Sequence, residues 1–462
     1  MKTWLAGCAL LGACAGPVLA QHGASALSMT LLAHEDLQGR SAYQPTVHEQ
    51  NGRWIAYVGH HGGRSANPLA GRDEDNGTSI IDVTDPRKPR YLAHIPGEPG
   101  QGETGGAQMV RVCSGRDLPG VRNSADKSKF YLLRTYGNLA HEVWDVTLPE
   151  KPARIVTLVD KLKGTHKNWW ECDSGIAYLV SGLPDWRTRR MTQVYDLSDP
   201  ARPVFIRNFG LAGQEPGSSG AVPTELHGPI STGAKGNRVY FGYGTNKDGV
   251  LQIVDRAKLL SGPREPTPQN LRAPEVGRFT LSSMNGAHTA LPVLGMNLPE
   301  FAKDKAAPRD FVFVVNESLA NECQEPRQFV FVVDVTDEKV PVGVATFNVP
   351  EQGDSCSRGG RFGSHSSNEN QPPMYAKKVI FVAWFNAGVR AVDISDPFRP
   401  REIGYYIPAT TDKTDKRCIK TEAGAERCKV AIQTNNVEVD DRGYIYIVDR
   451  ANTGMHILEL QR

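Results

Sequence analysis

Short apolar runs rich in β-branched and aromatic residues recur along most of the chain, and turn residues separate them. Runs of this length and composition are typical of β-strands, and no long segment has the 3.6-residue period of an amphipathic helix. The clearest runs are residues 54–58, 130–134, 176–180, 239–243, 311–315, 379–384 and 444–448. The pattern therefore predicts an all-β protein.

Another strand, with a common ending, follows each of these runs. In a four-stranded unit the runs listed above are the second strands and this one is the third. It ends in an acid and a hydroxyl residue and leads into a proline-containing turn, with clear copies around Asp82, Asp145, Asp196, Asp334 and Asp393 and weaker copies at Asp255 and Glu459. Asp before Pro favours a type I turn, and Pro, which lacks an N–H, is tolerated at the start of an edge strand. The ending therefore predicts a third strand, a turn and an outer fourth strand.

The acids stand roughly 50 to 80 residues apart, which suits a four-stranded sheet with its loops. Seven such units predict a seven-bladed β-propeller over residues 28–462. The last unit stops after its third strand, whereas residues 29–34 have the pattern of a fourth strand. We expect this N-terminal strand to complete the seventh blade, because the pairing ties the chain ends together and removes an exposed sheet edge.

These strands resemble the LVIVD-repeat family of exported bacterial β-propellers. The namesake sequence is echoed by residues 251–255, 332–335 and 391–394. The resemblance extends over almost the whole chain after the first twenty residues and implies a fold and an exported location. It implies no particular reaction.

Histidines fall at one equivalent position in four consecutive repeats. His166, His227, His288 and His365 each stand at the start of a predicted innermost strand, and the seventh repeat has Asn435 and Asn436 there. The start of every innermost strand faces the same mouth of the central channel. Because only 12 of the 462 residues are His, four at one such position predict a site.

Neutral imidazoles that converge in a channel suit one transition-metal ion, which could be iron, copper or zinc. Four carboxylates, Glu171, Glu225, Glu317 and Glu369, are predicted to orient them as hydrogen-bond acceptors. In architecture alone this resembles the four-histidine iron site of carotenoid-cleaving oxygenases and the selenium-binding protein group. No extended motif of either family is present, so their substrates do not carry over. The alternative is a polar channel in which each imidazole binds backbone or water.

His60 and His61 follow a predicted second strand in a Gly-rich segment. They could join the same mouth, or they could simply be exposed.

The first twenty residues predict an export signal. Lys2 precedes an apolar stretch, and residues 18–20 form a small-residue cleavage site. We expect a periplasmic or secreted protein, with lipoprotein anchoring at Cys14 as an alternative. Nothing later approaches the ~20 apolar residues of a membrane helix.

Six cysteines remain after the signal, and no C-x-x-C pair is present. An even number in an oxidising compartment predicts disulfides. Cys418 and Cys428 are the most local pair, and Cys113 and Cys172 end innermost strands of neighbouring blades. Cys323 and Cys356 are then left to link loops of the fifth and sixth blades.

With 53 basic and 51 acidic residues, the formal charge is only +2, so the chain has no global field for nucleic acid. Gly-x-Ser-x-Gly and phosphate-binding glycine loops are absent. Two function classes stay open. One is an exported metal-dependent oxidoreductase that acts on a small molecule, and the other is a non-catalytic propeller that presents loops to a protein or cell-surface partner.

Overall fold

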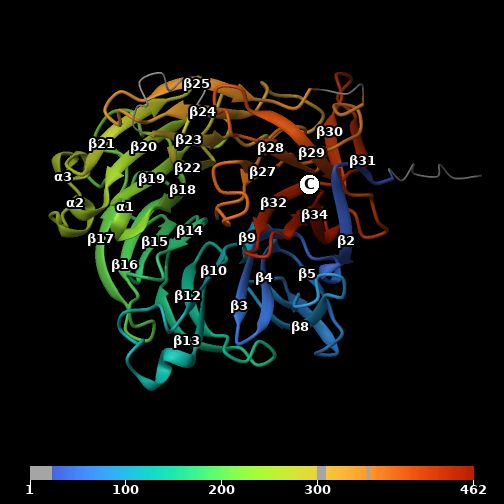
Figure 1. The fold of residues 1–462 in the computed structure, drawn as a ribbon, viewed down its shortest axis with the longest axis horizontal. Coiled ribbons are helices and arrows are strands. Elements are labelled where there is room, and N and C mark those ends of the chain that lie inside the picture. The colour runs from blue at the N-terminus through green and yellow to red at the C-terminus, as the bar shows by residue number, and fades with distance from the viewer. Residues whose placement is uncertain (1–22, 299–307, 351–353, 462) are drawn as a thin grey trace, which may run out of the picture.

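Seven four-stranded antiparallel sheets are arranged in a ring around a central channel in the computed structural model (Figure 1). The structure describes residues 23–298, 308–350 and 354–461. The predicted all-β fold and its seven blades are confirmed. The predicted signal at residues 1–20, with Cys14, lies outside the described residues.

Each blade runs from an innermost strand at the channel to a fourth strand at the rim. The innermost strands are β3 (Ala42–Gln50), β10 (Val110–Ser114), β14 (Asn168–Trp170), β18 (Leu226–Ser231), β22 (Thr289–Met296), β26 (Ser366–Ser367) and β32 (Thr434–Val439). The second strands are β4 (Arg53–Gly62), β11 (Phe130–Tyr136), β15 (Ile176–Ser181), β19 (Arg238–Tyr243), β23 (Arg309–Val315), β27 (Val379–Ala383) and β33 (Ile445–Asp449).

The outer half of each blade contains the repeated ending. The third strands are β7 (Thr78–Asp82), β12 (Ala140–Asp145), β16 (Met191–Asp196), β20 (Val250–Asp255), β24 (Val330–Asp334), β28 (Val389–Asp393) and β34 (Gly454–Leu460). The fourth strands are β8 (Arg90–Ile95), β13 (Ala153–Val159), β17 (Val204–Phe209), β21 (Glu275–Thr280), β25 (Val342–Phe347), β29 (Arg401–Ile407) and β2 (Met29–Glu35).

The N-terminal strand β2 is the outer strand of the seventh blade. It pairs with β34 from Met29 opposite Leu460 to Glu35 opposite Met455, so blue and red strands lie together in Figure 1. A short strand, β1 (Ser25–Leu27), pairs with β29 of the sixth blade. Residues ahead of position 28 therefore add a fifth strand to the sheet of the sixth blade.

The repeated acid and hydroxyl residue lie where the third strand ends beside the start of the second strand, at the end of the ladder away from the loop that joins them. The Asp82 carboxylate accepts a hydrogen bond from the Thr84 backbone N–H at 3.0 Å, and the Thr84 hydroxyl accepts one from the Trp54 N–H at 3.0 Å. Asp145 with Thr147 and Asp334 with Thr336 make the same contacts. The motif therefore satisfies backbone donors at the end of a ladder, where strand pairing stops.

Apolar side chains are buried between neighbouring blades. Seven clusters fill the seven interfaces. The cluster with Val58 and Tyr446 joins the seventh blade to the first, and the one with Phe381 and Val437 joins the sixth to the seventh. Because every blade shares an interface with each neighbour, the ring fixes where the innermost strands begin.

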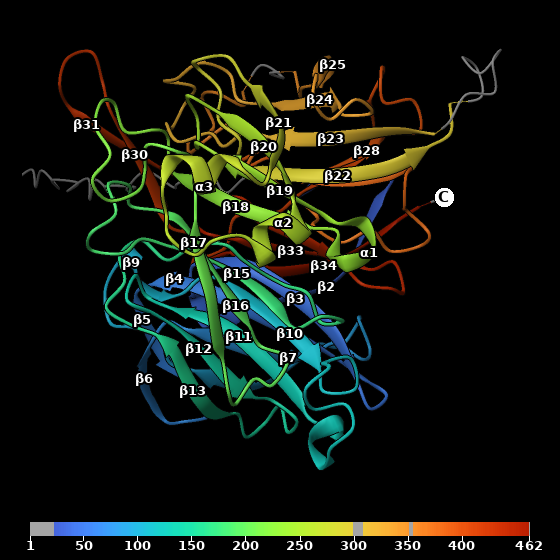
Figure 2. The same ribbon diagram turned by 90° about the vertical axis from the view of Figure 1, so that its left-hand side faces the viewer.

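Accessory elements gather at the two faces of the ring. Strand β9 (Gly102–Ala107) pairs with the end of β4, and two hairpins stand apart, β5 (Arg64–Asn67) with β6 (Arg72–Asp75) and β30 (Lys416–Lys420) with β31 (Glu426–Val430). In Figure 2, β5, β9, β30 and β31 lie toward one face and α1 toward the other. The helices are η1 (Leu37–Gly39), η2 (Ala125–Ser128), α1 (Gly233–Gly236), α2 (Arg256–Ser261) and α3 (Pro268–Arg272). None of the helices in the described ranges is long and apolar enough to cross a bilayer.

All three predicted disulfides form. Cys113 bonds Cys172 between the second and third blades, and Cys323 bonds Cys356 between loops. Cys418 bonds Cys428 across the β30–β31 hairpin. Disulfides and the lack of a membrane-spanning helix among the described residues are compatible with an exported protein.

Candidate metal centre

Four histidines meet at one mouth of the channel because the ring brings together the starts of four innermost strands. His227 lies in β18, His288 and His365 directly precede β22 and β26, and His166 stands two residues before β14. All four side chains are buried. The position predicted from the repeats is where the structure places them.

The imidazoles form a continuous row. Ring centroids are 4.3 Å apart for His166 and His227, 3.7 Å for His227 and His288, and 4.2 Å for His288 and His365. The Nε2 atoms of His166 and His227 are 2.8 Å apart. Two ligand atoms that bind one ion at right angles lie about 2.9 Å apart when each metal–nitrogen bond is about 2.05 Å long, so this pair is spaced as neighbouring ligands are.

The outer nitrogens of three rings are held by the protein. His227 Nδ1 donates to the His288 carbonyl at 3.0 Å, and His365 Nδ1 donates to the Asn435 carbonyl at 2.5 Å. His288 Nδ1 lies 2.9 Å from the Thr289 hydroxyl. A proton on Nδ1 leaves the Nε2 lone pair free for a metal, and a protein acceptor at Nδ1 fixes the ring orientation.

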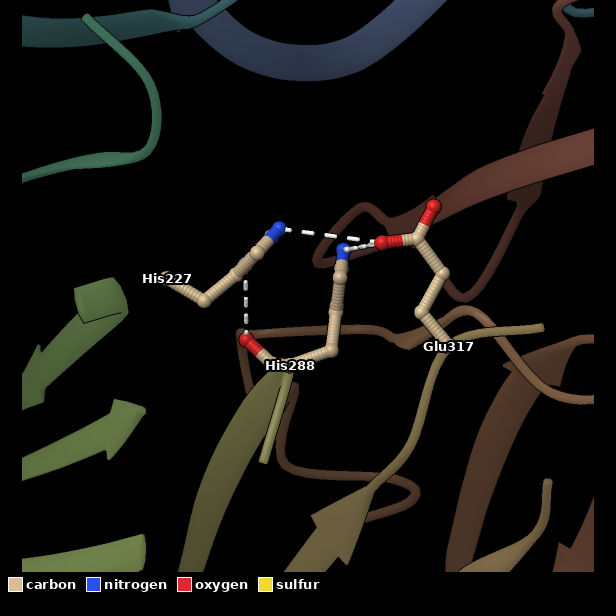
Figure 3. Close-up of side chains that lie close together, drawn as sticks. All are labelled: His227, His288 and Glu317. Atoms are coloured by element: carbon tan, nitrogen blue, oxygen red, sulfur yellow. Dashed lines mark hydrogen bonds and ion pairs between the residues drawn. The ribbon is translucent and has the colours of Figure 1, made fainter. Parts of the chain in front are cut away.

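Glu317 is the carboxylate that faces this row. One of its oxygens is 3.9 Å from Nε2 of both His227 and His288, and the other is 3.6 Å from His365 Nε2. Figure 3 shows the two imidazoles and the carboxylate pointing toward one another. The ligand atoms of His227, His288 and Glu317 lie within 4.8 Å of one another, as a metal-binding group requires.

Burial sets the charge state of the row. Burial lowers the pKa of each of the four histidines well below its usual value, and Lys167 lowers all four further. Burial raises the pKa of Glu317, and Arg361 at 3.0 Å and Arg450 at 3.7 Å offset this only in part. The imidazoles are therefore neutral near pH 7, the form that binds metals.

The other three predicted carboxylates lie elsewhere. Glu171 pairs with Arg256, Glu225 pairs with Arg189, and Glu369 pairs with Lys167 and Arg111. None of the three has a recorded contact with the four imidazoles. Each of the three lies just outside an innermost strand, so the adjoining loop sets its direction, and a residue near a histidine in sequence need not face the histidine row.

Glu369 nevertheless belongs to the next layer of the channel. Lys167 Nζ contacts Glu369 and lies 3.2 Å from the Thr289 hydroxyl, which is the partner of His288 Nδ1. Burial acts to raise the pKa of Glu369, but Lys167 and Arg111 outweigh it and hold this pKa at about 2. A buried ion pair therefore lies next to the histidine row and is joined to it through Thr289.

Tyr43 and His61 complete the wall of the mouth. The Tyr43 hydroxyl is 3.2 Å from His166 Nε2, and the Tyr43 ring stands edge-on to both His61 and His365. His60 and His61 are both buried, so the interpretation as an exposed pair is wrong for both. His60 faces Ser79 at 2.7 Å and not the row.

The donor set fits a metal ion. His288 Nε2, which faces Glu317, is a buried atom without a hydrogen-bond partner, and so is His166 Nδ1. Buried polar atoms are normally paired, so an unpaired one that faces other ligand atoms indicates a missing partner. Imidazole nitrogens with one carboxylate oxygen suit iron, copper or zinc.

The comparisons with known proteins bear on the fold. Residues 378–407, which include β27, β28 and β29, match the LVIVD repeat family model, and this confirms the resemblance at the sixth blade. No curated protein matches the chain.

Among solved structures, the chain is similar to the crystal structure of Chaetomium thermophilum Raptor, with a TM-score of 0.52 and 10% sequence identity. The match covers 92% of this chain and 28% of Raptor, so the chain spans about a quarter of Raptor's length. At this identity the likeness concerns the fold alone.

Proposed function

We propose that the protein is an exported β-propeller that binds one transition-metal ion at the histidine mouth and acts as a metal-dependent oxidoreductase on a small molecule. The ligands are His166, His227, His288 and His365, with Glu317 beside them. The observation that carries the proposal is the convergence of four imidazoles, three of which already have Nδ1 held by a protein group.

A polar channel without metal accounts less well for this geometry. In such a channel each Nε2 lone pair needs a donor. His227 Nε2 has one in His166 Nε2, 2.8 Å away, whereas His288 Nε2 has no hydrogen-bond partner and faces the Glu317 carboxylate at 3.9 Å. A lone pair and a carboxylate oxygen are both acceptors, so they repel unless a cation lies between them. Burial lowers the pKa of His288, so its ring is neutral and carries a single proton. With that proton on Nδ1, toward the Thr289 hydroxyl, Nε2 presents only its lone pair to the carboxylate.

Iron is the first ion to test. Two histidines with one carboxylate are the donor set of non-haem iron sites, and copper and zinc are the alternatives. Iron or copper supplies one-electron chemistry with dioxygen or an organic molecule. Zinc held by four imidazoles closes a tetrahedral site and indicates a structural role.

The chain's own residues supply the setting for that chemistry. The four imidazoles are buried, which keeps water away from the sides of the rings that pack against the protein. The Asn435 and His288 carbonyls fix two of the rings. Glu317 accepts a proton more readily than an ordinary carboxylate because burial raises its pKa. The Tyr43 hydroxyl, 3.2 Å from His166 Nε2, can donate a hydrogen bond at the mouth.

Metal analysis of untagged protein tests the proposal. We expect close to one equivalent of iron, copper or zinc in the wild type and only a small fraction of that in His227→Ala and His288→Ala. The matched control is His48→Ala, because His48 is half-buried on β3 and its Nδ1 contacts only the Glu49 carbonyl. Circular dichroism should show an unchanged β-sheet content in all three variants.

A wild type that binds no stoichiometric metal after incubation with Fe(II), Cu(II) and Zn(II) in turn overturns the proposal. The geometry of the mouth then belongs to an interaction module, the other class indicated by the sequence. Equal losses of metal in His48→Ala and His227→Ala would show that the ion is bound elsewhere.

A further inference from the structure

A cationic cavity lies next to the histidine row on the same face of the ring. Its volume is about 400 Å³, within the usual range for small-molecule sites. Its charged lining residues are Arg64, Arg417, Arg450 and Asp415, and His61 also lines it. Burial and the neighbouring arginines lower the pKa of His61 well below its usual value. Arg64 pairs with Asp75 at 3.3 Å, which leaves Arg417 and Arg450 as the cations available to a ligand; the carboxylates nearest to them, Asp415, Glu317 and Glu103, are 3.7 to 3.9 Å away.

Arg450 is shared between the cavity and the candidate metal centre. Its Nη2 is 3.4 Å from His61 Nε2, and its Nη1 is 3.7 Å from the Glu317 carboxylate, which in turn faces His365. Arg450 Nη1 is buried and makes no hydrogen bond. The guanidinium therefore has donor capacity that the protein does not use.

The guanidinium of Arg417 also lines this cavity and has a hydrogen-bond donor without a partner. Its Nη2 donates to the Arg450 carbonyl at 2.9 Å, which ties the two residues together. Its Nε is buried without a hydrogen-bond partner, and its nearest carboxylate, Asp415, is 3.8 Å away and half-exposed. Two adjacent arginines that repel each other and lack full partners are the arrangement that binds a carboxylate or a phosphate.

We propose that this cavity binds the anionic group of a small organic carboxylate or phosphate, with Arg450 and Arg417 as its cationic partners, and that this anion is the substrate of the neighbouring centre. The substrate role rests on the proposed function, whereas anion binding does not. Because Arg450 faces both sites, an anion that neutralises its charge should favour a metal cation near Glu317. By linkage the metal should then strengthen anion binding by the same factor.

Calorimetric titration of metal-free protein tests the anion site by itself. The probes are succinate, benzoate and inorganic phosphate, with succinamide as the uncharged analogue. We expect one saturable site for at least one anion, no binding of succinamide, and weaker binding at higher salt. The anion that binds more tightly, carboxylate or phosphate, identifies the chemistry of the substrate.

Arg450→Gln and Arg417→Gln should each weaken the binding of that anion about tenfold or more, the usual effect of losing one charge-assisted hydrogen bond. Arg417 does not contact Glu317, so its variant tests the cavity without disturbing the centre. The matched control is Arg202→Gln, because Arg202 is largely exposed and pairs only with Asp199. Equal binding in all three variants, or no anion binding in the wild type, overturns the proposal.

The same titration with metal-loaded protein tests the link between the sites. A lower anion Kd in the loaded protein supports the substrate role, and an unchanged Kd overturns it while leaving the anion site in place. If no metal can be loaded, the proposed function fails, and the metal-free titration still decides whether the cavity binds anions.

Discussion

Replacing Glu369 with Gln removes the buried charge that balances two cations beneath the histidine row. The side chains of Glu369 and Lys167 are each 3% exposed, and Arg111 makes the second contact with the carboxylate. The amide is similar in size to the carboxylate but carries no charge. Two buried cations are then left without their anion.

The magnitude follows from the pKa of Glu369. Its pKa of about 2, against an ordinary value of 4.5, corresponds to a contribution of roughly 3 kcal/mol to the free energy of unfolding. Breaking a buried ion pair by removing one partner costs about 3–5 kcal/mol, which is a similar range. Because the folded-state pKa is lowered, the contribution is complete above about pH 4.5 and is lost as the pH falls toward 2.

Urea unfolding followed by tryptophan fluorescence measures this difference. We expect Glu369→Gln to lower the free energy of unfolding by about 3 kcal/mol at neutral pH. The difference in the free energy of unfolding between the variant and the wild type should shrink markedly at about pH 3, where wild-type Glu369 is losing its contribution. The matched control is Glu150→Gln, because Glu150 is 41% exposed and its pair with Arg53 is at the surface. Its effect should stay below about 1 kcal/mol.

Equal effects of the two substitutions at neutral pH would refute the reasoning. A difference in the free energy of unfolding between Glu369→Gln and wild type that stays the same at every pH would refute it too. Adding Lys167→Met to Glu369→Gln should recover part of the lost stability, because it removes one of the two unpaired cations.

Three further predictions concern the ring. Burial raises the pKa of Glu438 to about 8, so wild type should lose stability as the pH rises from about 4.5 to 8, and Glu438→Gln should remove that loss in urea unfolding. Replacing Cys113 and Cys172 with Ala opens a link between residues 59 apart in sequence and should cost about 4 kcal/mol by the same assay. Deleting residues 23–35 removes β2, exposes the edge of β34 and should cause association visible by light scattering; a monomer would contradict this.

The fold was largely predictable because each repeat contains the same local chemistry. Asp82 and four counterparts cap a backbone N–H two residues later, so the motif locates the end of the third strand in five of the seven blades. The closing strand was also predictable, since the last repeat has no fourth strand and residues 29–34 have a matching pattern. The sequence did not reveal β1, because a three-residue strand has too little pattern to distinguish it from a loop.

The site was predictable only where repeat equivalence applies. The four histidines occupy one repeat position, so they could be placed together without knowing any distance. Three of the four predicted carboxylates stand within five residues of a histidine in sequence, and only the fourth, Glu317, faces the row. Glu317 follows β23 by two residues, and Arg450 follows β33 directly.

A second rule of the fold predicts the positions of Glu317 and Arg450. In an antiparallel blade the innermost strand begins at the mouth where the second strand ends. The ends of second strands therefore face the same mouth as the histidines, and His61, Glu317 and Arg450 all occupy such ends. The mouth is thus built from two rings of positions, one that supplies imidazoles and one that supplies the charges around them. The contacts of Lys167 follow neither rule. Its long side chain reaches across to Glu369 and Thr289. Such contacts depend on how far a side chain extends, which a sequence pattern does not encode.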